Sequence, residues 1–504
     1  MAIKRFETFM ATLSLLAFDG TTGGHVPVAD PIPETRKTEL GQYMTPLAIA
    51  SFMAEQFETE GMSDVVLLDA GAGQGSLSTA FAARWEKTAN IDNMLTLHAY
   101  ELDPRMIEIL RPNLRALEGS GRVSAKIFTG DFITNATDKI RSGERLYTHA
   151  ILNPPYKKIS SDSSARRSLS SVGIETVNLY SGFVALSLEL LKDGGELVAI
   201  IPRSFCNGPY YKPFRKFILD RAAIESIHLF VSRNQAFADD DVLQENVIIR
   251  VKKGAPQGSV VVSRSTNASF NDLQSDMVTF DRIVLPEDQE RFIRIPGLQS
   301  ERSLNEISAY SSTLREIGVS VSTGPIVDFR MKEHLQMEPL PGSVPLLYSG
   351  HFVDGEVVWP RRNFKKPNAI AENDETRRWL YPHGFYVAVK RFSSKEEKRR
   401  IVATLIDPAA LPDGRIGFEN HLNVIHIDKG PLPEELARGL VVYLNAKIVD
   451  DWFRQFNGHT QVNATDLRSL PFPNRAKLTE FGKWSVLASN VSQDDIDQKV
   501  GGAE

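Results

Sequence analysis

One stretch of the sequence reads Val65-Val66-Leu67-Leu68-Asp69-Ala70-Gly71-Ala72-Gly73-Gln74-Gly75, an apolar run that leads into a turn with three glycines. The apolar run predicts a buried strand, and the glycines permit positive φ angles and a close approach of the backbone to a ligand. Their spacing is not the Gly-x-Gly-x-x-Gly fingerprint of dinucleotide-binding proteins. The turn therefore indicates either a loop that binds another nucleotide-like group or a tight strand–helix connection.

Strand and helix patterns alternate around this stretch, from Val65 to about Lys253. We expect helices at Ser76–Lys87, Pro104–Leu117 and Leu179–Leu191, and strands at Val65–Asp69, Leu97–Glu101, Ala125–Thr129, His149–Leu152, Glu196–Ile201, Ser226–Val231 and Asn246–Val251. This order predicts an α/β fold with a mostly parallel sheet covered on both faces. Because ligands of such sheets bind at the carboxyl ends of the strands, functional residues should directly follow strands.

The chain has 504 residues, 42% hydrophobic and 24% charged, which is the balance of an ordinary soluble protein with a sizeable core. At this length we expect several parts: an N-terminal helix and loop (1–40), a first domain (41–255), a connecting segment (256–320), a second domain (321–475) and a tail (476–504) that is frayed after Ser492. The single cysteine, Cys206, excludes an intramolecular disulfide and argues against a cysteine-based zinc site, so we expect no metal. No apolar run reaches the ~18 residues of a membrane span, and we expect a cytoplasmic protein without membrane partners.

Acidic residues end three successive strands of this pattern, at Asp69, Glu101 and Asp131. Glu101 can accept hydrogen bonds from both hydroxyls of a ribose, and Asp131 can accept from an adenine amino group while Phe132 packs against the ring. Three carboxylates would repel a pyrophosphate, but they suit a ligand with hydroxyl and amino donors and a cationic centre. Together with Gly71 and Gly73 they predict a binding site for S-adenosylmethionine rather than NAD.

The most specific feature is Asn153-Pro154-Pro155-Tyr156, directly after the strand expected at His149–Leu152. The two prolines stiffen the turn, so the Asn153 side-chain oxygen and the Pro154 main-chain oxygen can be aimed at one point. Two such acceptors would bind both hydrogens of an exocyclic amine and direct its lone pair towards an electrophilic methyl group, without a strong base. Tyr156 adds an aromatic face for a planar substrate. These four residues are the predicted catalytic site.

A family resemblance supports this interpretation. In chain order, Asp69–Gly75, Glu101, Asp131-Phe132 and Asn153–Tyr156 resemble the motif series of the gamma-class amino-DNA methyltransferases, and further matches lie at Gly41–Pro46, Gly194–Pro202 and Ala236–Ile248. The segments Lys390–Glu397 and Gly458–Leu467 resemble modification methylases of the PstI type. The resemblance covers nearly the whole chain. It implies a Rossmann-like class I fold that uses S-adenosylmethionine, followed by an α+β target-recognition domain.

The resemblance also implies roles for single residues. Tyr43, Thr45 and Pro46 would lie over the methionine end of the cofactor. The target base would be flipped out of the duplex, with Tyr156 stacked on one side and Phe237 on the other. A Phe before a strand is usually a core residue, so a core position remains the alternative for Phe237.

Double-stranded DNA is the expected partner because basic residues gather in one segment. Residues 361–400 hold 12 Lys and Arg against 5 Asp and Glu, whereas the whole chain has a formal charge of −5. A phosphate-facing surface and a solvated charged face both fit this segregation. The predicted DNA-binding residues are Lys157, Lys158, Arg361, Arg362, Lys365, Lys366, Lys390, Arg391, His459, Gln461 and Asn463.

The expected function is transfer of a methyl group from S-adenosylmethionine to adenine N6 in a specific DNA sequence, which protects the DNA from a cognate restriction endonuclease. We expect the endonuclease to be a functional partner rather than part of a stable complex. Asn153 favours adenine by resemblance, but cytosine-N4 methylation would use the same amine chemistry. A DNA-specificity protein without activity is the alternative of a different class, and the intact set of Asp69, Glu101, Asp131 and Asn153 argues against it.

Overall fold

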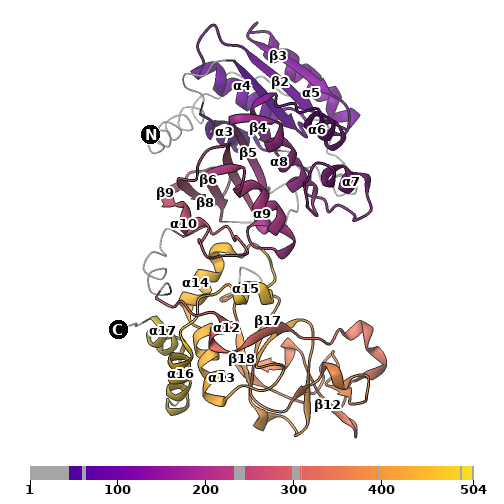
Figure 1. Ribbon diagram of the computed structural model, residues 1–504, viewed down its shortest axis with the longest axis vertical. Helices are drawn as coiled ribbons and strands as arrows, with labels where there is room; N and C mark the ends of the chain where they lie inside the picture. Colours follow the sequence, from indigo (N-terminus) through magenta and orange to yellow (C-terminus); the bar gives the residue numbers. More distant parts are fainter. Residues whose placement is uncertain are drawn as a thin grey trace. The chain divides into compact units, whose positions relative to one another are not determined.

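The computed structural model describes residues 45–58, 64–231, 245–297, 307, 309–393, 397–488 and 491–501. The chain divides into two compact units, Met1–Ile295 and Pro296–Glu504 (Figure 1). Each unit has its own hydrophobic core clusters. The N-terminal helix and loop expected at 1–40 lie outside the described residues.

The first unit is built on a nine-stranded sheet with the order β3-β2-β1-β4-β5-β7-β6-β8-β9. Its first seven strands are β1 (Val65–Ala70), β2 (Leu95–Tyr100), β3 (Val123–Phe128), β4 (Tyr147–Leu152), β5 (Leu191–Pro202), β6 (Ala222–Phe230) and β7 (Asn246–Lys253). β3, β2, β1, β4 and β5 run parallel, and β7 is antiparallel to both β5 and β6. The predicted α/β fold with a mostly parallel sheet is confirmed. The strand order reverses between β1 and β4, where such sheets bind ligands.

Two further strands lie in the segment 256–320, which we expected to be a connection. β8 (Ser259–Ser265) runs parallel to β6, and β9 (Gln274–Thr279) pairs antiparallel with β8, before the short helix α10 (Phe280–Ile283). The first unit therefore reaches Ile295, and the boundary predicted at 255 is wrong. An edge strand such as β9 buries little apolar surface, so its sequence carries only a weak strand pattern.

Helices cover both faces of this sheet (Figure 1). One face carries α3 (Leu47–Glu55), α4 (Ser76–Thr88) and α5 (Pro104–Glu118), whose apolar side chains share a buried cluster with the strands. The other face carries α6 (Phe132–Arg141), α8 (Leu179–Leu190) and α9 (Lys212–Leu219), while α7 (Ser164–Ser170) lies in the loop that follows β4. The loops at the carboxyl ends of β1, β2 and β4 remain available for the predicted site residues.

The second unit is α+β, as predicted. A four-stranded sheet has the order β10-β20-β17-β18, a five-stranded sheet has the order β11-β15-β12-β19-β16, and β13 pairs with β14. Its strands are β10 (Ser320–Thr323), β11 (Leu335–Gln336), β12 (Ser343–Leu347), β13 (Phe352–Val353), β14 (Glu356–Val357), β15 (Ala369–Ala371), β16 (Tyr381–Pro382), β17 (Tyr386–Lys390), β18 (Ala403–Ile406), β19 (Arg415–Phe418) and β20 (Leu422–His426). Its helices are α12 (Leu314–Ile317), α13 (Glu434–Leu444), α14 (Lys447–Phe456), α15 (Ala464–Arg468), α16 (Arg475–Leu487) and α17 (Gln493–Gly501).

The described part of the predicted C-terminal tail forms packed helices. Gly439 of α13 and Gly482 of α16 allow backbone contact, because a Cβ on either residue would lie 1.7 Å from a carbonyl oxygen of the other helix. In α17, the Gln493 side chain donates to Asn445 O at 2.9 Å, and Asp497 accepts from Lys447 N at 2.6 Å. The expectation of a frayed end after Ser492 is therefore wrong for residues 493–501.

Among the described residues, no helix combines the length and the apolar content that a membrane crossing requires.

Candidate functional site

The glycine turn after β1 has the backbone that the sequence predicted. Gly71, Gly73 and Gly75 have φ angles of 83°, 55° and 88°, which disfavour any residue with a side chain. The amides of Gly71 and Ala72 both donate to Tyr100 O at 2.9 Å, which ties the turn to the end of β2. A Cβ on Gly73 would meet nothing within 4 Å, so the turn is open at that point. This geometry fits a ligand that approaches the backbone closely.

Glu101 ties the ends of β1 and β2 together. Its Oε2 accepts from Gly73 N at 2.8 Å, and its Oε1 accepts from Leu102 N and Asp103 N, each at 2.8 Å. The carboxylate is 4% exposed and fixed beside the glycine turn. Leu102 is 61% exposed directly next to it, an apolar surface that the sequence analysis did not single out. Its position one residue after the strand-end carboxylate was an available signal.

Asp69 places its side chain inside the core of the first unit. It is the penultimate residue of β1 and fully buried, and its Oδ2 accepts from Ser78 Oγ of α4 at 2.5 Å. Burial raises the pKa of Asp69 to about 7. The Asp69 side chain therefore contacts α4 within the core, and its predicted contact with the cofactor stays a prediction.

Asp131 and Phe132 start α6 at the end of β3. Asp131 caps the helix, with its Oδ2 accepting from Thr134 N at 3.0 Å and from Thr134 Oγ1 at 2.6 Å, and the residue is exposed. Phe132 is 4% exposed, and its ring packs against Tyr100 and Phe183 with centroid distances of 5.1 and 4.9 Å. The Asp131 carboxylate is accessible, whereas Phe132 is largely a core residue.

The predicted catalytic loop follows β4 and is hydrogen-bonded to Thr45, close to the start of α3. Asn153 Nδ2 donates to Thr45 Oγ1 at 3.0 Å, so two residues predicted from separate motifs are in contact. The Tyr156 hydroxyl lies 3.1 Å from Asn153 Oδ1 and 3.2 Å from Ile200 O of β5. Pro154 is buried and makes the turn rigid. Two other predicted residues of this region, Tyr43 and Phe237, lie outside the described residues, and their roles stay predictions.

Lys157 and Lys158 continue this loop with exposed side chains. Their backbone is held by a short antiparallel pairing with the segment before α8, in which Leu179 N donates to Lys157 O and Ile159 N donates to Val177 O, both at 2.8 Å. The two lysines therefore lie beside the predicted catalytic loop, and their side chains are exposed.

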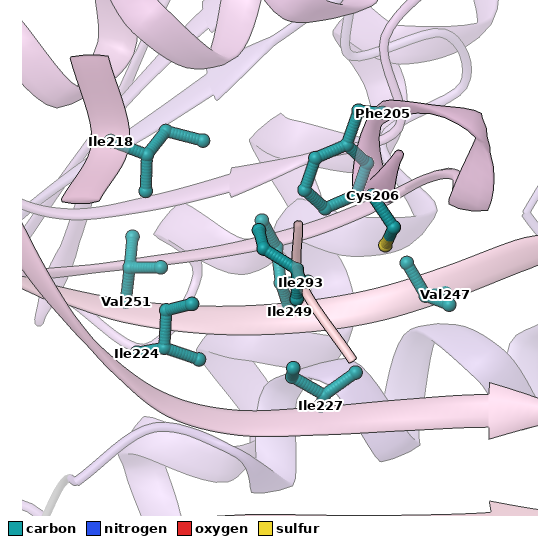
Figure 2. Close-up of a pocket in the computed structure, with 9 residues that line it drawn as sticks. All are labelled: Phe205, Cys206, Ile218, Ile224, Ile227, Val247, Ile249, Val251 and Ile293. Atoms are coloured by element: carbon teal, nitrogen blue, oxygen red, sulfur yellow. The ribbon is translucent and has the colours of Figure 1, made fainter. Parts of the chain in front are cut away.

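The only cysteine lies in an apolar cavity of about 10 Å³, which is no larger than one water molecule (Figure 2). The side chains around Cys206 include Phe205, Ile227 and Ile293 (Figure 2). Burial raises the pKa of the Cys206 thiol to about 12. The cavity is part of the core, and its thiol has none of the thiolate character that reactivity requires.

In the second unit, the structure brings two predicted DNA-binding segments together. Ser393 N donates to Thr460 O at 3.0 Å and Val462 N donates to Arg391 O at 2.7 Å, so the residues after β17 pair with those before α15. His421 joins them, because its carbonyl accepts from Arg391 N at 2.9 Å. We call Arg391, Phe392, His421 and Gln461 the paired-loop cluster.

His421 was missed by the sequence analysis because no local motif marks it. Its Nδ1 lies 2.5 Å from Oε1 of Glu419, a fully buried carboxyl whose pKa is raised by that burial. The imidazole is 46% exposed, and its ring centroid lies 5.0 Å from that of Phe392, which is also 46% exposed. The buried carboxylate thus orients a ring that faces solvent.

The basic segment 361–400 is only partly a solvent-facing surface. Arg362 and Lys365 are exposed, as predicted for phosphate contacts. Lys366 lies 2.7 Å from Asp328 and, through this bond, lowers the pKa of that carboxyl. Arg361 is half-buried, with its backbone N–H donating to Asn368 Oδ1 at 2.8 Å and its guanidinium donating to Gly350 O.

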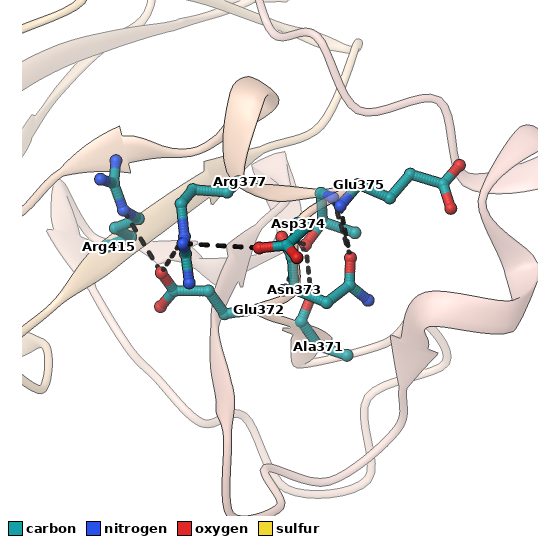
Figure 3. Close-up of polar contacts among 8 residues, drawn as sticks. Ala371, Glu372, Asn373, Asp374, Glu375, Arg377 and Arg415 are labelled. Carbon is teal, nitrogen blue, oxygen red and sulfur yellow. Dashed lines mark hydrogen bonds and ion pairs between the residues drawn. The ribbon is translucent and has the colours of Figure 1, made fainter.

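Other charges of this segment are neutralised within the fold. Figure 3 shows Arg377 between the carboxylates of Glu372 and Asp374, at 3.3 and 3.7 Å, with Arg415 on Glu372 at 3.3 Å. Arg400 is 1% exposed, and its guanidinium donates to Ser393 Oγ at 3.0 Å and to Asn457 Oδ1 at 2.7 Å. The net charge of the segment therefore overstates its free positive surface.

The remaining predicted DNA-binding residues differ in exposure. Lys390 is half-buried at the end of β17. Asn463 and Asp466 form a capping box at the start of α15. Asp466 Oδ2 accepts from Asn463 N at 2.9 Å, and the Asn463 side chain accepts from the backbone of Asp466, so the Asn463 side chain has a structural partner. His459 is half-buried, and its carbonyl accepts from the Arg400 guanidinium. Gln461 Oε1 lies 3.5 Å from Arg391 Nη2, within the paired-loop cluster.

One group among the described residues has the composition of a metal site, although we expected no metal. Glu333, His334 and Glu375 each bring a ligand atom within 4.8 Å of the others. His334 Nε2 lies 3.4 Å from Glu375 Oε2, a distance that a His–carboxylate contact explains by itself.

Sequence relatives were found for nearly the whole chain. Residues 121–237 match the Eco57I restriction-modification methylase family. The chain is 48% identical over 474 residues to the Type II methyltransferase M.BsuBI of Bacillus subtilis, covering 92% of this chain and 94% of the relative. It is 43% identical over 479 residues to the Type II methyltransferase M.PstI of Providencia stuartii, covering 93% of this chain and 94% of the relative.

Solved structures share the fold at low sequence identity. The DrdV–DNA complex superimposes with a TM-score of 0.52 at 14% identity, covering 89% of this chain and 57% of that chain. The Type IIL restriction-modification enzyme MmeI, solved in complex with DNA, gives a TM-score of 0.51 at 11% identity, covering 93% of this chain and 71% of that chain.

Proposed function

Since this chain belongs to the Type II DNA methyltransferases of restriction–modification systems, which use S-adenosylmethionine, we propose that it methylates the N6 amine of adenine within a specific double-stranded DNA sequence. The observation that carries the proposal is the hydrogen bond from Asn153 Nδ2 to Thr45 Oγ1. In the structure, the Nδ2 end of Asn153 faces Thr45 and the Oδ1 end faces Tyr156. The loop thus presents an acceptor, which binding of an amine requires.

The first unit fits the cofactor because the turn at Gly73 is open and lies beside the Glu101 carboxylate. When bound, S-adenosylmethionine supplies an electrophilic methyl group on a sulfonium centre. Glu101 would hold the ribose hydroxyls, and Asp131, at the end of β3, would accept from the adenine amino group. The exposed side chain of Leu102 offers apolar contact to the adenine ring.

The Asn153 loop would hold the substrate amine. One amine hydrogen takes the place of the Tyr156 hydroxyl at Asn153 Oδ1, and the other is accepted by the main-chain oxygen of Pro154. Both acceptors increase the electron density on the amine nitrogen. They also direct its lone pair out of conjugation with the adenine ring and towards the methyl group. The amine proton leaves after the nitrogen becomes positively charged, so the loop needs no strong base. Tyr156 is left to stack on the base.

The second unit would recognise the DNA sequence. Arg and Gln side chains match the edges of guanine and adenine, and the paired-loop cluster presents Arg391 and Gln461 next to two exposed rings, Phe392 and His421. Arg362 and Lys365 would contact phosphates, which position the protein without reading sequence. Methylation at such a site would protect host DNA from a cognate endonuclease, with no stable complex between the two proteins.

The test is methyl transfer from labelled S-adenosylmethionine to plasmid DNA, followed by nucleoside analysis of the product. We expect labelled N6-methyladenine. Labelled N4-methylcytosine would redirect the proposal to cytosine, whose amine suits the same pair of acceptors. Label confined to protein would overturn DNA as the substrate.

A further inference from the structure

Asn246 is a buried amide with no role in the chemistry above. It is the first residue of β7 and 3% exposed. Within the described part of the chain, neither its Oδ1 nor its Nδ2 has a hydrogen-bond partner. Because buried polar groups are nearly always hydrogen-bonded, an amide with both ends unpaired indicates a partner that arrives from outside the protein.

The strand register places Asn246 at the active end of the sheet. β7 is antiparallel to β5, and Asn246 pairs with Pro202, so the start of β7 lies at the carboxyl ends of the parallel strands. Ile200, two residues before Pro202, presents its main-chain oxygen to the Tyr156 hydroxyl. Only β5 separates β7 from β4, the strand that leads into Asn153.

Asn246 also shares a face of the sheet with the residues around Asn153. Side chains alternate along a strand, so Asn246 points to the same face as Ile248. Ile248 and Ile200 belong to the buried cluster that α3 covers. Thr45, which accepts from Asn153, lies two residues before the first residue of that helix. The three polar side chains of Thr45, Asn153 and Asn246 therefore lie at one end of one face.

The backbone next to Asn246 is held in place by a buried ion pair. Arg203 N donates to Glu245 O at 2.7 Å, and Arg203 Nη1 donates to Glu245 Oε2 at 3.1 Å. The two residues are 5% and 7% exposed, and they flank Pro202 and Asn246. The amide is thus part of a rigid strand end, as a preorganised binding group requires.

We propose that Asn246 is a base-positioning residue whose amide hydrogen-bonds a ring nitrogen of the flipped base, while Asn153 and Pro154 hold the exocyclic amine. The inference rests on the proposed function. Ring nitrogens of adenine are acceptors and match the Nδ2 donor. A base held at both its amine and its ring has a defined orientation in its plane, which aligns the amine lone pair for transfer.

Asn246→Leu separates this role from a structural one. Leucine is similar in size and has no polar atom, so the free protein should melt at the same or a higher temperature. We expect kcat/KM on DNA to fall about 10-fold while the affinity for S-adenosylmethionine is unchanged. Asn90→Ala, in the exposed turn before β2 at the amino ends of the strands, is the matched control and should behave as the wild type.

Target DNA with 1-deaza-, 3-deaza- or 7-deazaadenine identifies the atom that Asn246 binds. The kcat/KM of the wild type should fall about 10-fold on one of the three analogues. The kcat/KM of Asn246→Leu should show no additional loss on that analogue. Additive penalties, no penalty with any analogue, or a leucine variant as active as the wild type would overturn the role of Asn246 while wild-type adenine methylation stands. A wild type that makes no N6-methyladenine would overturn the proposed function itself.

Discussion

The strand ends of the first unit and the basic segment 361–400 of the second unit use their polar residues differently. Glu101 and Asn153 directly follow parallel strands, and their side chains are fixed by defined hydrogen bonds at one edge of the sheet. In the basic segment, Arg400 is buried in hydrogen bonds, whereas Arg362 is exposed. Neighbouring charges in that segment therefore have unrelated roles.

The difference has a physical cause. Parallel strands end at a common edge, so residues that follow them are brought together by the sheet itself. An irregular segment has no such constraint, and a long basic side chain can turn inwards to carbonyls or carboxylates. Motif positions after strands thus predict a site better than a count of charges. Asp69 marks the limit of the rule, because it lies within β1 and its side chain points into the core.

The largest expected effect is on the catalytic loop. Asn153→Ala should lower kcat by about 10³-fold, because one of the two preorganised acceptors is lost, while cofactor affinity is unchanged. Thr45→Val should cause a smaller loss, since it removes only the partner that orients the Asn153 amide. Single-turnover methylation and titration calorimetry with the cofactor measure both effects. Normal turnover in Asn153→Ala would remove the loop from the mechanism.

The second effect concerns the buried carboxyl of the same unit. Asp69 has a folded-state pKa of about 7, above its ordinary value of 3.8, so between these values the folded protein binds the extra proton. Its contribution to stability should therefore fall by about 1.4 kcal/mol per unit as the pH rises from 4 to 7. Asp69→Asn should lack this loss. Urea unfolding of both proteins between pH 4 and 9 checks it, and parallel pH profiles would contradict it.

The third effect tests whether Arg400 is structural. Arg400→Met should destabilise the second unit by about 3 kcal/mol, because it leaves the buried oxygens of Ser393 and Asn457 without their donor. Thermal melting measures this loss. Arg362→Ala is the matched control from the same segment and should melt like the wild type. Equal melting temperatures for the two variants would contradict a structural role for Arg400.

The smallest effect is expected from the exposed charges. Arg362→Ala and Lys365→Ala should each weaken DNA binding without altering stability, and each should reduce the slope of log affinity against log salt by about 1. Fluorescence anisotropy over a range of salt concentrations measures the slope. Lys87→Ala, an exposed change in the last turn of α4, is the control. Unchanged slopes would assign DNA contact to other residues.

Much of the fold was predictable because buried parallel strands appear in a sequence as short apolar runs between helical patterns. The expected strands correspond to β1 through β7. β8 and β9 were not predicted: β9 lies at the sheet edge and buries little, whereas the apolar run Val260–Val262 of β8 was not recognised as a strand. The C-terminal helices were missed for a different reason. α13 and α16 pack through the bare backbone of Gly439 and Gly482, and this contact leaves no hydrophobic periodicity in the sequence.

The candidate site was predictable where its residues are adjacent in the sequence and form one motif. Asn153 through Tyr156 form one loop, and its likeness to a known motif series led to the correct family. His421 depends on a buried partner, Glu419, and carries no mark of its own in the sequence. Asn246 opens an apolar run and looks like any strand residue. Its significance comes only from the lack of a hydrogen-bond partner for its side chain among the described residues.

Residue order alone established the α/β core and the cofactor, and it predicted the loop Asn153–Tyr156 as the site that binds the amine, because these rest on local patterns and on strand ends that share an edge. Folding in three dimensions settled which charges are free, how Asp69 is used, and that Arg391 meets Gln461, 70 positions further along the chain. Burial and pairing are properties of contacts between distant segments. They therefore emerge only when those segments pack against one another.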